Sequence, residues 1–305
     1  MNDMTNLNAE TLDIGLHTSA ILVDLTIRQW QGRKLDKRAT QNVNIDAGAK
    51  QGMARVNKSL LGNNPELEAI RKHVTATRDN LALLTAAWDG TKRILRTDNA
   101  DECVAMLDEA RVHFNNLVGE FLDNYEYARA DAELMLGHLY NPDDYPDKYD
   151  LANKFSFFWG VSPVPKQGDL RVDLSEQTKA LVLEQFRQTQ ANDMTRAMED
   201  VWTRVADVTG RMAERLTQVG GEKRKVFRDT LVSNITDLLS VLDGLNVTND
   251  PTLASIANDM RRKMHGVTPN QLRHNDTLRT KLRADMVKAN AAAKQAIDNL
   301  PGLGF

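Results

Sequence analysis

The chain has 305 residues, of which 41% are hydrophobic, 27% charged and 6% aromatic, with a formal net charge of −3. This lean and charged balance suits helices with narrow apolar seams better than a thick globular core. A single cysteine, Cys103, excludes an internal disulfide framework and fits a reducing compartment. The first ten residues lack the order of a signal peptide, and no apolar run approaches the length of a membrane span. We therefore expect a cytoplasmic protein without membrane contact.

Charge is segregated along the chain. Between Arg28 and Lys58 there are eight Lys or Arg residues and two acids, whereas between Asp98 and Asp150 there are fourteen acids and three bases. From Asn249 onward the bases again outnumber the acids, nine to five. Segregated charge can steer a polyanion or an oppositely charged protein. The alternative is that the basic and acidic segments pair inside the molecule, which the near-neutral total also fits.

The N-terminal part is predicted to hold a strand and a basic helix over residues 16–62, after a disordered stretch over 1–15. Ile21–Trp30 is rich in β-branched residues and alternates apolar and polar from Val23 onward, which predicts a strand. The basic run Arg33–Arg38 is expected to open a helix. Gly62–Pro65 is a clear break.

Long acidic helices are predicted over residues 65–139. One should run from Glu66 to Trp88, with Pro65 at its start. The other should run from Asn99 to Leu139, because apolar residues recur every seven positions through it and form one stripe.

A loop and a β-hairpin are predicted over residues 140–174. Tyr140–Asp147 contains two prolines and stops the preceding helix. Phe155–Val161 and Asp169–Leu174 are expected to be short strands joined by a Pro- and Gly-bearing connector. With Ile21–Trp30 they would make a three-stranded antiparallel sheet, which is about the minimum for stability.

A long helix and a return helix are predicted over residues 175–245, and further helices over 249–299. The pattern Ser-Glu-Gln-Thr from Ser175 is typical of a helix start. The expected helices are Glu176–Val219, closed by Gly220-Gly221, then Glu222–Leu242, Asp250–Met264 and Thr268–Asn299. The predicted fold class is thus mainly α, with long antiparallel coiled-coil-like helices and a small β element of about three strands.

No catalytic, cofactor-binding or metal-binding motif stands out, so we expect neither an enzyme nor a cofactor. Cys103 is predicted to be a buried, inert thiol. Four acids lie close together after the second long helix and could hold a divalent cation, but acids that stop helices are common and the pattern of a calcium loop is missing. These acids are Asp143, Asp144, Asp147 and Asp150.

Two groups of residues are candidate contact sites. The first joins cations on one helical face to an adjacent aromatic, which suits phosphate contact and base stacking, although a solvated first turn is the alternative. Its residues are Trp30, Arg33, Lys34, Lys37 and Arg38. The second is an aromatic cluster that would contact a protein partner or simply pack the small sheet. Its residues are Phe155, Phe157, Phe158 and Trp159.

Two blocks of the sequence resemble an uncharacterised family of tailed-phage and prophage proteins. The first is Ala20–Trp30 with Gly32–Lys37, and the second is Lys154–Phe157 with Pro163–Pro165 and Gly168–Leu174. The resemblance implies a bacteriophage protein in the host bacterial cytoplasm. It also implies a gene that lies among phage DNA-metabolism genes, sometimes beside the gene of a MoxR-like AAA+ ATPase, and it carries no assigned activity.

Together these observations predict a phage-encoded helical interaction or scaffold protein that acts through protein–protein contacts, with an AAA+ ATPase or as a homo-oligomer. The alternative is a nucleic-acid-binding accessory protein of phage DNA metabolism that uses the basic N-terminal segment.

Overall fold

The computed structural model describes residues 16–166, 174–217 and 229–301. Two compact units make up the chain. Unit 1 comprises the described parts of Met1–Asp24, Asn80–Val104 and Gly160–Phe305, and unit 2 comprises Leu25–Asp79 and Ala105–Trp159. The predicted disordered N-terminus, the strand from Asp169 and the Gly220-Gly221 cap lie wholly or largely outside the described residues.

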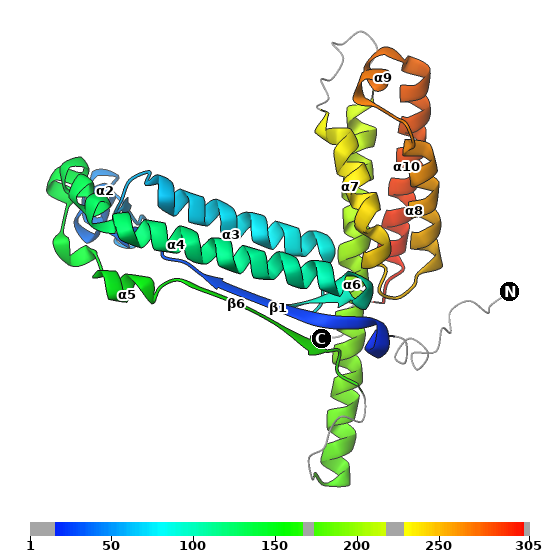
Figure 1. The fold of residues 1–305 in the computed structure, drawn as a ribbon, viewed down its shortest axis with the longest axis horizontal. Helices are drawn as coiled ribbons and strands as arrows, with labels where there is room; N and C mark the ends of the chain where they lie inside the picture. The colour runs from blue at the N-terminus through cyan, green and yellow to red at the C-terminus, as the bar shows by residue number, and fades with distance from the viewer. Residues whose placement is uncertain (1–15, 167–173, 218–228, 302–305) are drawn as a thin grey trace. The chain divides into compact units, whose positions relative to one another are not determined.

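The structure is mainly α, as predicted, and its elements follow in chain order (Figure 1). They are β1 (Ala20–Arg28), β2 (Arg33–Leu35), α2 (Lys37–Asp46), β3 (Asn57–Ser59), α3 (Pro65–Leu84), β4 (Ala86–Ala87), β5 (Lys92–Arg96), α4 (Ala100–Leu136), α5 (Lys148–Ala152), β6 (Ser156–Pro163), α6 (Glu176–Arg215), α7 (Thr230–Leu245), α8 (Pro251–Met264), α9 (Pro269–His274) and α10 (Asp276–Asp298). Among the described residues no helix is both long and apolar enough to cross a membrane.

Helices α6, α7, α8 and α10 lie alongside one another in unit 1 (Figure 1). The apolar face of α6 belongs to their core, where Val201, Trp202 and Met212 are at most 1% exposed. Ser175 caps α6 by accepting a hydrogen bond from the backbone N–H of Thr178 at 3.2 Å. Since α6 packs against α10 and α7, the predicted coiled-coil arm of two long helices is not confirmed.

The C-terminal helix predicted over Thr268–Asn299 is instead two helices, α9 and α10. Thr268 forms a capping box with Gln271, as a helix start requires. The chain then becomes extended at Asn275, whose side chain accepts the N–H of Leu278 at 2.9 Å and starts α10. The helical periodicity continues across this break, and therefore it did not reveal the second cap.

Among the described residues the larger sheet has four strands in the order β4-β5-β1-β6, so the predicted element of about three strands is not confirmed. The two predicted strands around Ile21–Trp30 and Phe155–Val161 are confirmed as β1 and β6. The neighbour of β1 on its other side is β5, which pairs antiparallel with it from Ala20 opposite Arg96.

The first long helix ends four residues earlier than predicted, at Leu84 and not at Trp88. Ala86 pairs with Ile94 across the turn that follows, which makes β4 and β5 a short hairpin. Asp89 accepts the backbone N–H groups of Thr91 and Lys92 in that turn. The pair Asp89-Gly90 is a common hairpin signal, and it would have located the turn.

In unit 2, helices α3 and α4 run side by side (Figure 1) and share one core. Ile70 and Val74 of α3 meet the aromatic side chains of Phe114, Phe121 and Tyr125 of α4, all of them at most 1% exposed. These residues recur at spacings of four and seven, so one face of each helix is apolar and the opposite face remains in solvent.

Candidate interaction surfaces

Strand β2, helix α2 and strand β3 form a small element over residues 33–59, called here the basic element. The two strands pair antiparallel, with Lys34 opposite Lys58. Asp36 caps α2 by accepting the N–H of Ala39 at 2.8 Å. The element contains seven Lys or Arg residues, two acids and no aromatic residue.

Two of its lysines pair inside unit 2 with the turn that follows α4. Asp144 accepts the ammonium of Lys34 at 2.8 Å and that of Lys58 at 2.7 Å. Burial acts to raise the pKa of Asp144, but the hydrogen bonds and charges of the two lysines outweigh it and hold that pKa below its ordinary value. Two cations of the basic segment are therefore paired inside the molecule. Their partner is the turn after α4 and not the acidic helix itself.

The other cations of the basic element stay in solvent. They are exposed, and none of them forms an ion pair within the described part of the chain: Arg33, Lys37, Arg38, Lys50 and Arg55. Large apolar side chains of the same element are exposed beside them: Leu35 at 41%, Val43 at 44%, Ile45 at 66% and Met53 at 75%. The basic element thus offers a mixed cationic and aliphatic surface.

Trp30 does not belong to this surface. Its ring is partly buried and packs against Phe121 and Tyr125 of the unit 2 core, with ring centroids 6.2 and 6.1 Å away. The tryptophan is therefore partly buried, whereas Arg33, Lys37 and Arg38, with which the sequence had grouped it, are exposed.

The side of α4 that faces away from α3 carries a second surface, called here the acidic face. Its residues recur every three or four positions, so they share one side of the helix, and every one of them is exposed. Val112 is 57% exposed, Tyr127 is 77% and Leu134 is 84%. The full row is Glu109, Val112, Asn116, Glu120, Asp123, Tyr127, Asp131 and Leu134.

Acids between these apolar residues are largely unpaired. Glu109, Glu120 and Asp131 form no ion pair in the described ranges, while Asp123 lies 3.0 Å from Lys148. Sequence reasoning missed this face because it followed the buried stripe of the helix. A second search for spacings of three and four on the opposite side would have found Val112, Tyr127 and Leu134.

The predicted aromatic cluster is divided between the core and the surface. Phe155 packs against Phe121 and Phe157 against Phe114, with ring centroids 5.8 and 5.6 Å apart. Phe158 is 59% exposed, as the alternation of a strand requires. The buried indole nitrogen of Trp159 has no hydrogen-bond partner among the described residues. Packing therefore accounts for two of the four, and Phe158 alone extends into solvent.

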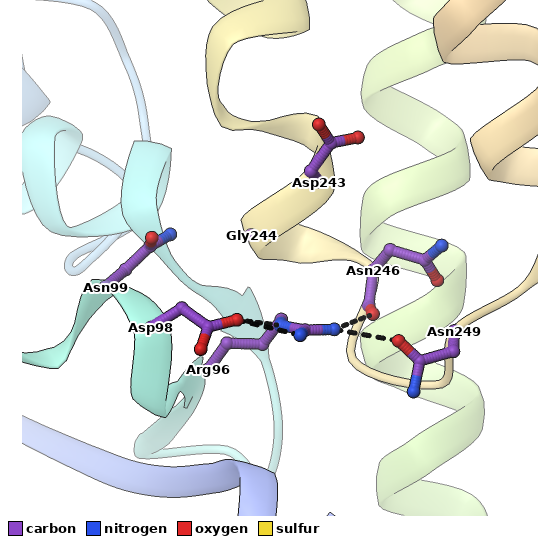
Figure 2. Close-up of a pocket in the computed structure, with 7 residues that line it drawn as sticks. All are labelled: Arg96, Asp98, Asn99, Asp243, Gly244, Asn246 and Asn249. Carbon is purple, nitrogen blue, oxygen red and sulfur yellow. Dashed lines mark hydrogen bonds and ion pairs between the residues drawn. The ribbon is translucent and has the colours of Figure 1, made fainter.

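A polar pocket of about 340 Å³ lies in unit 1 beside Arg96 (Figure 2). The guanidinium of Arg96 donates to the carboxylate of Asp98, to the backbone carbonyl of Asn246 and to the side chain of Asn249. Asn246 is 8% exposed and exchanges hydrogen bonds with the backbone of Asp250. Because these bonds join β5 to the turn between α7 and α8, the pocket is assigned a structural role.

A charged cluster of unit 1 is structural as well. Asp200 on α6 accepts the guanidinium groups of Arg204 at 2.7 Å and Arg93 at 3.1 Å, and the backbone N–H of Ala87 at 2.7 Å. Arg204 also donates to the backbone carbonyl of Thr85, directly after α3. Burial raises the pKa of Asp200, but Arg204, Ala87 and Arg93 together hold it below its ordinary value.

The cysteine and the acidic cluster singled out in the sequence do not form a reactive or metal-binding site among the described residues. Cys103 is fully buried, and burial raises its pKa to about 11, which fits the predicted inert thiol. Within the described ranges no group of three or more His, Cys, Asp or Glu residues could hold a metal ion. Asp144 is occupied by lysines, and Asp147 caps α5 by accepting the N–H of Asp150.

No protein-family model, curated protein or solved structure matches this chain. The resemblance to phage and prophage proteins therefore stays a prediction. The fold and the two surfaces define the chain only as a mainly helical protein with exposed charged and apolar faces.

Proposed function

We propose that the chain is a helical interaction protein that acts through protein–protein contacts, either as a homo-oligomer or as the partner of an AAA+ ATPase. The observation that carries this proposal is the acidic face of α4. Val112, Tyr127 and Leu134 are more than half exposed and share that face with unpaired acids.

Isolated exposed apolar residues are ordinary on any protein surface. A row of them at helical spacing is different, because a partner can cover all of them with one contact. Tyrosine is enriched among the residues that dominate binding energy, since it buries a large area at a small cost in side-chain entropy. A protein partner with apolar and basic side chains could bury the apolar groups of this face and form ion pairs with its acids.

Affinity capture followed by quantitative mass spectrometry tests the proposal. The tagged full chain and the variant Tyr127→Ser/Leu134→Ser are used as baits in a lysate of the source cells. Leu181→Ser/Val287→Ser is the matched control, because both side chains are exposed, at 64% and 45%, and belong to unit 1 and not to the acidic face. We expect at least one protein, an AAA+ ATPase if the phage context holds, to be lost from the variant and kept by the control. Equal capture by all three baits contradicts the proposal.

Nucleic-acid binding is a second candidate, and the five unpaired cations of the basic element favour it. They could contact phosphates, which gives affinity that falls steeply with salt. Base stacking by Trp30 would compete with the packing of its partly buried ring against Phe121 and Tyr125. Fluorescence anisotropy with a labelled duplex at two salt concentrations tests this candidate. Binding that is insensitive to Arg33→Ala/Lys37→Ala/Arg38→Ala removes it.

A further inference from the structure

We infer that two copies of this chain bind each other through unit 2, with the basic element of one copy docked on the acidic face of the other. The inference rests on the proposed function and names one partner for it, a second copy of the chain. Both surfaces belong to unit 2, and their charges are opposite.

Charge complementarity is the first support. The basic element has five exposed cations without an ion pair in the described ranges, among them Arg33, Arg38 and Arg55. Three exposed acids of the acidic face also form no ion pair in the described ranges: Glu109, Glu120 and Asp131. Complementary surfaces of this kind steer encounter and set the register of a complex.

Apolar residues on both surfaces are the second support. Ile45 and Met53 lie exposed within the basic element, and Tyr127 and Leu134 within the acidic face. A phosphate backbone would contact the cations and leave Ile45 and Met53 in water. A helix that carries acids and apolar residues covers both kinds of group, so these aliphatic residues favour protein over nucleic acid.

The internal pairing of unit 2 leaves both surfaces available. Lys34 and Lys58 are occupied by Asp144, which belongs to the turn after α4 and not to its exposed face. The row from Glu109 to Leu134 is about 37 Å long at 1.5 Å per residue. That length is enough for an ordinary interface, which buries about 800 Å² on each partner.

Each copy carries one surface of each kind, which determines the assemblies that can form. Two copies that exchange both contacts make a closed dimer, whereas copies that use different neighbours make a ring or an open chain. In either case, a copy with a defective basic element still has an intact acidic face. The intact basic element of a copy with a defective acidic face can bind to it.

Light scattering coupled to size-exclusion chromatography tests the inference on the full chain. The basic-element variant is Arg33→Glu/Arg38→Glu/Arg55→Glu, and the acidic-face variant is Glu109→Lys/Glu120→Lys/Asp131→Lys. The matched control is Lys281→Glu/Lys288→Glu/Lys294→Glu, which reverses three exposed cations on α10. Circular dichroism confirms that each variant is folded.

We expect the wild type and the control to associate at about 1 to 100 μM in low salt, and high salt to weaken the association. Each surface variant alone should bind itself at least about 100-fold more weakly, because attraction becomes like-charge repulsion. An equimolar mixture of the two variants should form a heterodimer, since each keeps the surface that the other lacks.

Three results would overturn the inference: a wild type that stays monomeric throughout this range, surface variants that associate normally, or a mixture that stays monomeric. Duplex binding by a monomeric wild type, lost only in the basic-element variant, assigns that element to nucleic acid instead. Affinity capture with the surface variants as baits distinguishes failure of this inference from failure of the proposed function. If the chain does not self-associate but these baits still capture another protein, the inference is wrong and the proposed function is retained.

Discussion

The ammonium of Lys58 lies 2.7 Å from a carboxylate oxygen of Asp144, and both side chains are only 9% exposed. The two residues are far apart in the sequence, and their contact ties β3 to the turn after α4. Lys58 also donates to the backbone carbonyl of Leu139 at 2.5 Å. This pair neutralises charge at one point of the basic element and leaves its outer cations in solvent.

Asp144→Asn should therefore destabilise the chain by about 2 kcal/mol, because the buried ammonium of Lys58 loses its counter-charge. Asp143→Asn is the control, since Asp143 is exposed and forms no ion pair in the described part of the chain. Urea unfolding monitored by circular dichroism measures both. Equal midpoints for the two variants would show that the pair contributes little.

The same pair predicts a pH dependence. The pKa of Asp144 is lowered in the folded state from an ordinary value of 3.8. Its contribution to stability is therefore present above pH 3.8 and is lost as the pH falls through the lower folded value. Stability measured from pH 6 down to pH 2 should fall less steeply in Asp144→Asn than in the wild type. Parallel curves would contradict this assignment.

Asp200→Asn should cost about 2 kcal/mol in unit 1, because Arg93 and Arg204 would then face each other without a carboxylate between them. Asp207→Asn is the matched control on the same helix. Its carboxylate is 60% exposed and lies 3.6 Å from Arg211, so its loss should change stability by less than about 0.5 kcal/mol. Thermal unfolding of the two variants distinguishes these outcomes, and an equally small effect at both positions would contradict the assignment.

Gly244→Ala should destabilise the chain by no more than about 1 kcal/mol, because a Cβ at this position would overlap the side-chain amide of Asn99, which must rotate away. Combining it with Asn99→Ala should restore most of the loss by removing the obstacle. Gly119→Ala is the control, since a Cβ there meets open space and alanine favours a helix by about 1 kcal/mol. A Gly244→Ala chain as stable as the wild type would mean that Asn99 moves aside freely.

Cys103 should not react with a thiol reagent at pH 8 in the folded chain. It is fully buried, and its pKa is raised to about 11, so the thiolate is both scarce and covered. Absorbance after addition of an aromatic disulfide measures the reaction. One equivalent should appear only after guanidinium unfolding, and rapid labelling of the folded chain would contradict the burial of this thiol.

The sequence alone determined those features that depend on neighbouring residues. The starts of α6 and α8 follow from Ser175 and Asp250, because a capping side chain reaches an N–H only two or three residues away. The stripe of α4 and the alternation of β1 are likewise local periodicities. Such periodicities can be read from the sequence because the spacing of side chains along one helix or strand determines which of them share a face.

The tertiary structure decided which of these residues meet. Trp30 became partly buried because Phe121 and Tyr125 of α4 pack against it, and the side chain of Lys58 became buried because Asp144 lies against it. Neither relationship follows from spacing, since each joins segments far apart in the chain. For the same reason the sequence could group Arg33, Lys37 and Arg38 as basic, but only the folded chain shows that they remain in solvent while Lys34 is paired.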